Sequence, residues 1–124
     1  MMRTNIRLPY YMHTTLLSNA SDLLAQLPGP EGQRFAKAFA HGTMSAELYA
    51  PIGVDNQTPH QQDELYIVRS GQATLLIEGK PHPCAAGTVV FVPALADHRF
   101  IEFSEDFTTW VIFWGPQGGE TYTS

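Results

Sequence analysis

The chain has 124 residues, of which 44% are hydrophobic and 15% charged, so it is long enough to bury the core of one domain and too apolar for a disordered chain. Twelve acidic and seven basic residues give a net charge of −5, and because no basic cluster could follow a phosphate backbone, we expect no nucleic-acid partner. No segment approaches the roughly 20 apolar residues that span a bilayer, and the single cysteine, Cys84, excludes an intrachain disulfide, so we expect a cytoplasmic protein with no membrane partner.

The first part of the chain, residues 1–42, is predicted to be an N-terminal arm with a short helix that packs on the main body. The run from Ser18 to Asp22 offers several helix-capping side chains, and three leucines that could form an apolar face follow it. Pro28-Gly29-Pro30 then ends the helix. A second, weaker helical turn is expected between Glu31 and Phe39, because two phenylalanines lie four residues apart there.

From Thr43 onward, short runs of β-branched and aromatic residues alternate with Gly, Pro and Asn breaks, a pattern typical of an all-β domain. Seven strands are expected, at 44–49, 64–68, 73–77, 81–85, 88–92, 98–103 and 108–114. Short strands with tight turns favour a small antiparallel jelly-roll barrel over residues 43–116. Residues 117–124 lack apolar periodicity, and we expect a flexible tail there.

Three residues could hold a metal ion: His60, Glu64 and His98. Two imidazoles and one carboxylate are the ligand set of open mononuclear sites. On a straight strand, residues 60 and 64 would lie about 13 Å apart, at ~3.3 Å per residue, which is too far for one ion. The polar residues between them must therefore bend the chain, and His98 must arrive from a third strand at the mouth of the barrel.

The strand that begins at Glu64 would place Tyr66 on the same face, because side chains alternate along a strand. Tyr66 is thus a candidate fourth ligand or proton donor. By the same reasoning, Phe100 and a tryptophan are expected to line the interior of the barrel. On the other face, Leu65, Ile67, Val111 and Phe113 are expected to form a second apolar surface, which a homodimer would cover.

Each candidate ligand also has a plainer interpretation. His60 could be an exposed residue near a turn, and Glu64 could pair with Arg69 or Arg99 at the surface. His98 could be a core histidine bonded to a backbone carbonyl. A metal ion has one advantage over these alternatives, because a buried carboxylate without a partner is costly and a cation would supply one.

The segment that contains these residues resembles the cupin superfamily. The first cupin motif, in its common form H-x-H-x3-E-x6-G, is matched by His60, by Glu64 and by the six residues that lead to Gly71. Thr58 stands where the motif has its first histidine. Because threonine is a weak ligand, the site would have three ligands and open positions, or it would be degraded. Asp63 or Tyr66 could fill the gap.

The second cupin motif, G-x5-P-x-G-x2-H-x3-N, is matched at Gly87, Pro93 and His98. Leu95 replaces its second glycine, and Glu102 replaces its asparagine. The two motifs agree in spacing together, so the resemblance implies a small RmlC-like jelly roll.

The resemblance also implies a function. His60, Glu64 and His98 would bind Fe, Mn, Ni or Zn, and the protein would be a metal-dependent enzyme of the dioxygenase, isomerase or lyase type. Its substrate would be a small carboxylate or carbonyl compound, with Tyr66 as the nearest proton-transfer group. The alternative is a non-catalytic module that binds or senses a metal or small ligand. A metal-free isomerase with a histidine base is a third reading, which Asp97 disfavours because it would point away from His98.

Overall fold

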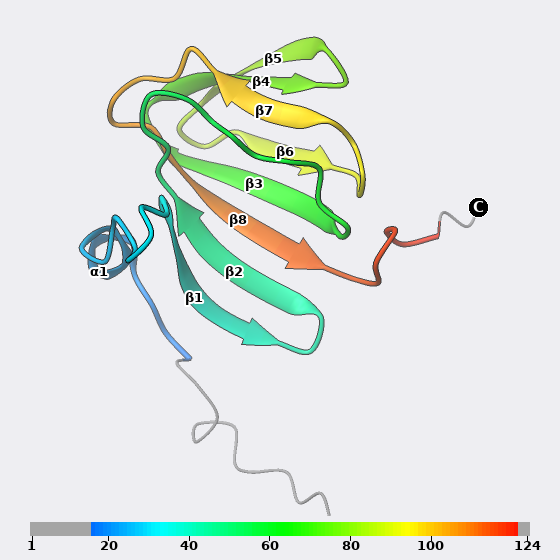
Figure 1. Ribbon diagram of the computed structural model, residues 1–124, viewed down its shortest axis with the longest axis horizontal. Helices are drawn as coiled ribbons and strands as arrows, with labels where there is room; N and C mark the ends of the chain where they lie inside the picture. The colour runs from blue at the N-terminus through cyan, green and yellow to red at the C-terminus, as the bar shows by residue number, and fades with distance from the viewer. Residues whose placement is uncertain (1–15, 122–124) are drawn as a thin grey trace, which may run out of the picture.

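The computed structural model describes residues 16–121. Eight strands form two antiparallel sheets, and one short helix packs on the larger sheet (Figure 1). Residues 1–15 of the expected arm and 122–124 of the expected tail lie outside the described residues. The all-β class and the small antiparallel barrel predicted from the sequence are confirmed. Within the described part of the chain, no helix is long and apolar enough to cross a membrane.

The larger sheet has five strands in the order β1-β2-β8-β3-β6, and the smaller sheet has three in the order β5-β4-β7. In chain order, the strands are β1 (Phe35–His41), β2 (Met44–Tyr49), β3 (Asp63–Ser70), β4 (Gln72–Ile77), β5 (Lys80–Ala85), β6 (Val89–Val92), β7 (His98–Ile101) and β8 (Thr108–Trp114). The seven strands from β2 to β8 correspond to the seven expected from the sequence.

The helical turn expected between Glu31 and Phe39 is wrong, because Phe35–His41 is strand β1. It pairs antiparallel with β2 and extends the larger sheet by one strand. Its burial follows a period of two at the start, with Ala36 buried between the exposed Phe35 and Lys37. Two phenylalanines four residues apart are weak support for a helix of so few residues, and the β2 partner decided the conformation.

The expected helix is α1, Ala20–Leu24. The side chain of Asn19 caps it by accepting a hydrogen bond from the backbone N–H of Asp22 at 3.0 Å. Leu23 is buried in a small apolar cluster with Ala36 of β1 and Leu48 of β2. The helix therefore covers the outer face of the larger sheet at β1 and β2, which lie beside it in Figure 1.

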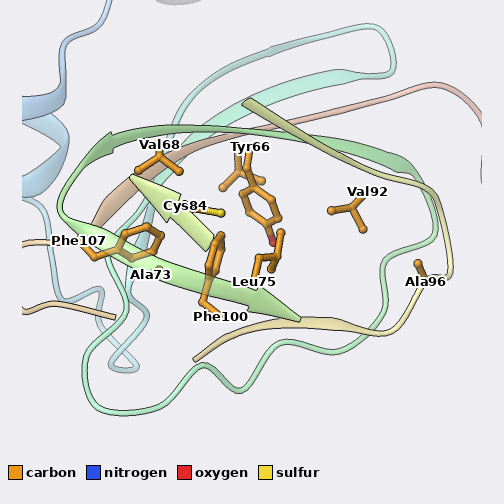
Figure 2. Close-up of a cluster of buried hydrophobic side chains, with 10 residues drawn as sticks. Tyr66, Val68, Ala73, Leu75, Cys84, Val92, Ala96, Phe100 and Phe107 are labelled. Atoms are coloured by element: carbon orange, nitrogen blue, oxygen red, sulfur yellow. The ribbon is translucent and has the colours of Figure 1, made fainter. Parts of the chain in front are cut away.

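The main core lies between the two sheets (Figure 2). Tyr66 of β3 packs edge-on against Phe100 of β7, with ring centroids 4.8 Å apart, and Phe100 contacts Phe107 at the same distance. The described core includes Leu75 of β4, which is fully buried. These side chains fill the space between the two sheets.

The facing of β8 differs from the expectation. Val111 is 3% exposed and belongs to the main core, and Phe113 packs against that core. Both residues therefore point inward, and they are not part of an outer apolar surface. Trp110 instead packs with Leu23 and its neighbours on the outer face, and Trp114 lies against the exposed Phe91, so neither tryptophan lines the interior. Both faces of this strand are apolar, and alternation alone cannot say which face is buried.

Candidate metal centre

His60 lies in the loop 50–62, immediately before β3, and the chain bends between it and Glu64 as its spacing requires. The side-chain amide of Gln62 holds this bend by donating hydrogen bonds to the carbonyl oxygens of Thr43 and Gly115, both at 2.9 Å. The backbone of His60 is also held, because its carbonyl accepts a hydrogen bond from Leu95 N at 2.7 Å. The bend therefore rests on contacts with segments distant in the sequence.

His98 is the first residue of β7 and is 3% exposed. Its Nδ1 lies 2.9 Å from the carbonyl oxygen of Ala96, which can only accept a hydrogen bond. Nδ1 must therefore carry a hydrogen, and in the neutral ring Nε2 then carries a lone pair. The plain reading of His98 as a carbonyl-bonded histidine accounts for one ring nitrogen and leaves the other available.

The three candidate ligands converge. His98 Nε2 lies 3.0 Å from Glu64 Oε1, and His60 Nε2 lies 4.0 Å from the same oxygen. The ligand atoms of all three residues lie within 4.8 Å of one another. Glu64 is 1% exposed, at the start of β3, where β6 and β8 flank it. The fold thus brings together His60 from the loop, Glu64 from β3 and His98 from β7.

The buried polar atoms at this point have few partners. Apart from the 3.0 Å contact between His98 Nε2 and Glu64 Oε1, neither that nitrogen nor either Glu64 oxygen has a hydrogen-bond partner among the described residues. Buried polar atoms are nearly always satisfied, and an unsatisfied carboxylate is costly. A lone pair on Nε2 facing a carboxylate oxygen is repulsive unless a proton or a metal cation lies between them. Two imidazoles and a buried carboxylate in this arrangement fit a divalent cation.

The pKa directions agree with this arrangement. Burial lowers the pKa of His98, but the contacts with Glu64 and with the carbonyl of Ala96 outweigh it and leave that pKa raised. The pKa of His60 is lowered, chiefly by burial. In the metal-free protein, the proton that a cation would have to displace is therefore the one on His98.

Tyr66 lies beside this site, with its ring centroid 6.0 Å from that of His98. It is fully buried, and its hydroxyl donates a hydrogen bond to Oε1 of Gln57 at 3.0 Å. Its pKa is raised well above the usual value by burial and by the charge of Glu64. The phenol therefore stays protonated and can donate a hydrogen bond but cannot serve as a base. Thr58, in contrast, is exposed.

A hydrogen-bond network behind the site was not found by sequence reasoning. Asp55 is 2% exposed, and its carboxylate accepts hydrogen bonds from Phe100 N at 2.8 Å, from the Tyr49 hydroxyl, and from the backbone and side chain of Gln57. It thereby joins the loop 50–62 to β7 and β2. In the sequence Gly53-Val54-Asp55-Asn56, an aspartate is an ordinary turn residue, and no local signal marks it as buried.

A pocket of about 420 Å³ opens beside His60. Its walls come from the segment before β1, from β1, β2 and β8, and from the loop 50–62. They are formed by Arg34, Phe35, Glu47, Tyr49, Val54, Asn56, Gln57, Thr58, His60 and Val111. Sequence reasoning missed Arg34 and Glu47. Burial, together with the charge of Glu64, raises the pKa of Glu47, although Lys37 opposes this.

Comparisons with known proteins agree with the fold. The cupin domain family model matches residues 47–114. An uncharacterised protein of Streptomyces coelicolor is 42% identical over 76 residues, which is 60% of this chain and 72% of that protein.

Among solved structures, a cupin 2 conserved barrel domain protein from Salinispora arenicola superposes with a TM-score of 0.59 at 18% identity, covering 92% of this chain and 91% of that chain. An RmlC-like cupin from Shewanella frigidimarina gives a TM-score of 0.56 at 16% identity, covering 64% and 73%. At these identities the two structures support the fold alone.

Proposed function

The chain belongs to the cupin domain family, and we propose that His60, Glu64 and His98 hold one divalent metal ion within its barrel. The observation that carries the proposal is the burial of both Glu64 oxygens and of His98 Nε2 with no hydrogen-bond partner except the 3.0 Å contact between Glu64 and His98 themselves. A cation would satisfy all three atoms at once and would remove the repulsion across the 3.0 Å contact. Fe, Mn, Ni and Zn all suit a set of two imidazoles and one carboxylate.

The activity that this site supports best is that of a small metal-dependent cupin enzyme, of the dioxygenase, isomerase or lyase type. When bound, the metal would act as a Lewis acid on a substrate oxygen. The residues of the chain would position and protonate the reacting groups. The carbonyl of Ala96 fixes the ring of His98, and the protonated hydroxyl of Tyr66 lies near Glu64. The apolar core behind them excludes water.

A small carboxylate substrate is supported by the pocket beside His60. Arg34 lines this pocket, and its Nε donates to the carbonyl of Ala50 at 2.9 Å. This bond anchors the guanidinium, and within residues 16–121 its terminal nitrogens have no hydrogen-bond partner and can meet a ligand. Phe35 and Val54 offer an apolar wall next to it. A guanidinium beside an apolar wall suits a small organic acid with its carboxylate on Arg34.

The non-catalytic alternative shares the metal site. It is favoured by Tyr66, whose hydroxyl already donates to Gln57 and so has its one proton engaged. A metal-loaded protein that binds small acids and turns none over would support this alternative over an enzyme.

Metal content tests the proposal. We expect wild-type protein, purified without chelators, to hold close to one transition metal per chain by elemental analysis, and His60→Ala and Glu64→Gln to lose most of it. His82→Ala is the matched control, because His82 is exposed on β5. A wild-type protein that takes up none of the four metals on direct titration would refute the metal site.

We further propose a cytoplasmic homodimer. With Val111 and Phe113 on the inner face, the apolar outer face of the larger sheet is formed by residues of β3, β6 and β8. It includes Phe91 at 53% and Val89 at 59% exposure. Their register places Phe91 beside Leu65, on the side of the sheet away from the core. A second copy that covers this face would bury them. Sedimentation should give the dimer mass for wild type and the monomer mass for Phe91→Glu, and a wild-type monomer would contradict the proposal.

A further inference from the structure

The first cupin motif has a histidine ligand that this chain lacks. None of the three residues considered as its replacement, Thr58, Asp63 and Tyr66, is available to a metal ion. Thr58 is exposed. Asp63 uses both carboxylate oxygens, which accept hydrogen bonds from Ala94 N and Glu120 N at 2.9 Å each. Tyr66 points its hydroxyl at Gln57. A fourth protein ligand to the proposed metal ion would therefore have to come from another residue.

We propose that Gln57 supplies this ligand through its side-chain oxygen Oε1, and thereby replaces the missing histidine from the neighbouring position. The inference rests on the proposed metal site. Oε1 of Gln57 lies 3.2 Å from Nε2 of His60, and the two residues line the same pocket. An amide oxygen is a neutral ligand that divalent metals accept together with imidazole and carboxylate.

The orientation of the Gln57 amide is fixed by its neighbours. Its Nε2 lies 2.8 Å from Oδ2 of Asp55, and a carboxylate can only accept a hydrogen bond there. The amide nitrogen must therefore face Asp55, and the oxygen must face His60. The backbone N–H of Gln57 also donates to Oδ1 of Asp55, at 3.2 Å. The buried Asp55 thus holds both ends of the residue in place.

The spacing of the donor atoms suits a shared ion. Two donors that each lie about 2.1 Å from one ion are about 3.0 Å apart at a right angle and about 4.2 Å apart when they are opposite. The distance of 3.2 Å between Gln57 and His60 matches neighbouring positions, as does that of 3.0 Å between His98 and Glu64. The distance of 4.0 Å between His60 and Glu64 lies between these two limits.

Tyr66 is compatible with this role. A carbonyl oxygen has two lone pairs, and the Tyr66 hydroxyl uses one of them at 3.0 Å. The second lone pair is free for the metal. In the metal-free protein it can accept the Nε2 hydrogen of His60, so the 3.2 Å contact alone does not distinguish a ligand from a hydrogen-bond partner.

Gln57→Leu separates these roles, because it removes a ligand in one case and only a hydrogen-bond acceptor of His60 in the other. Co(II) and Mn(II) are the probes, with dissociation constants measured by competition with a chromophoric chelator and Co(II) coordination followed by visible absorption. We expect Gln57→Leu to weaken binding by about tenfold or more and to change the Co(II) spectrum. Thr58→Val, the adjacent control, should change neither quantity.

If Gln57 only accepts a hydrogen bond from His60, its removal would make the Nε2 hydrogen of His60 easier to displace, and metal binding would stay the same or strengthen. Unchanged or tighter binding with a wild-type spectrum in Gln57→Leu would overturn the inference, while the metal site would stand. A wild-type protein that binds neither probe refutes the proposed metal function itself, which keeps the two failures distinct.

Discussion

The carbonyl of Ala96 determines which nitrogen of His98 can act at the site. It takes the Nδ1 hydrogen and leaves Nε2 facing Glu64 at 3.0 Å. Without a cation, this contact is favourable only when Nε2 is protonated, and the pKa of His98 is raised accordingly. The same proton must leave when a metal binds, so metal affinity and pH are coupled at this residue.

Metal affinity should therefore fall in acid, and the sign follows from the pKa shift. Because the folded-state pKa of His98 is raised above 6.5, the competing proton is present below that raised value and absent above it. We expect the Co(II) affinity to be constant at high pH and to fall about tenfold per pH unit below the raised pKa. His60 does not bind a competing proton near the raised pKa of His98, because its own pKa is lowered. Calorimetry in buffers of different ionisation enthalpy would measure the released proton. An affinity that stays constant down to the ordinary histidine range would contradict this reasoning.

Asp55 should contribute strongly to stability. It satisfies the backbone N–H of Phe100, which is 1% exposed, together with the Tyr49 hydroxyl and two groups of Gln57. In Asp55→Ala, the Phe100 donor would be buried without a partner. We expect a loss of about 3 kcal/mol in the free energy of unfolding, measured by urea denaturation of the metal-free protein. Asp97→Ala, at an exposed position, should change it by less than about 0.5 kcal/mol. Equal effects of the two changes would show that the Asp55 network adds no stability.

At the level of single residues, the sequence was informative where spacing carried the signal. His60, Glu64 and His98 could be singled out because a bend and a third strand bring them together, and the structure does so. Asp55, Gln57 and Arg34 could not be singled out, because a polar residue in a loop has no periodicity that indicates its direction. Their positions depend on contacts between segments far apart in the chain, such as that of Asp55 with Phe100.

The turn between β6 and β7 has a left-handed residue that is not glycine. Leu95 stands where the second cupin motif has glycine, yet its φ is 70°, in the left-handed region that favours glycine. The N–H of Leu95 donates to the carbonyl of His60 at 2.7 Å. The strained backbone at this turn therefore helps to hold a candidate ligand.

The turn between β3 and β4 should tolerate only glycine at position 71. A Cβ there would lie 2.6 Å from Phe107 Cα and from Ser104 Oγ. Gly79, in the β4–β5 turn, has nearly the same φ, 78° against 77°, but a Cβ there would meet nothing within 4 Å. Gly79→Ala therefore measures the backbone strain alone. We expect Gly71→Ala to lower the free energy of unfolding by about 2 kcal/mol more than Gly79→Ala, by urea denaturation. Equal losses would mean that the close approach of Phe107 is relieved without cost.

At the level of elements, the sequence located the strands but did not always show which of their side chains point into the core. The runs from Met44 to Trp114 contain enough β-branched and aromatic residues, and enough Gly and Pro breaks, to define seven strands. For β8, both faces are apolar, and its inward phase depends on its pairing with β3, where Val111 lies opposite Tyr66. For β1, the partner strand overrode a weak helical signal. In both cases the missing information was the identity of the neighbouring strand.

The pocket is a property of the whole molecule, because its walls come from segments that span residues 34 to 111. Arg34 and His60 both line it, although 26 positions separate them in the sequence. Arg34 is fixed twice to Ala50, since its Nε donates to the Ala50 carbonyl and its own carbonyl accepts from Ala50 N, both at 2.9 Å. A charge held in this way at the wall of a cavity is preorganised to bind an anion.

Carboxylate binding should therefore depend on Arg34. Butyrate and butyramide have nearly the same shape and differ in charge, and ligand-observed NMR on the chelator-treated protein compares them without a contribution from metal. We expect wild type to bind butyrate more tightly than butyramide. In Arg34→Gln the ratio of the two dissociation constants should fall about tenfold, which corresponds to ~1.4 kcal/mol, the value of one charge-assisted pair. Lys37→Gln is the control, because Lys37 is an exposed cation on β1 that does not line the pocket. If Lys37→Gln loses as much as Arg34→Gln, the preference comes from the general field of the surface, and the assignment of the carboxylate to Arg34 fails.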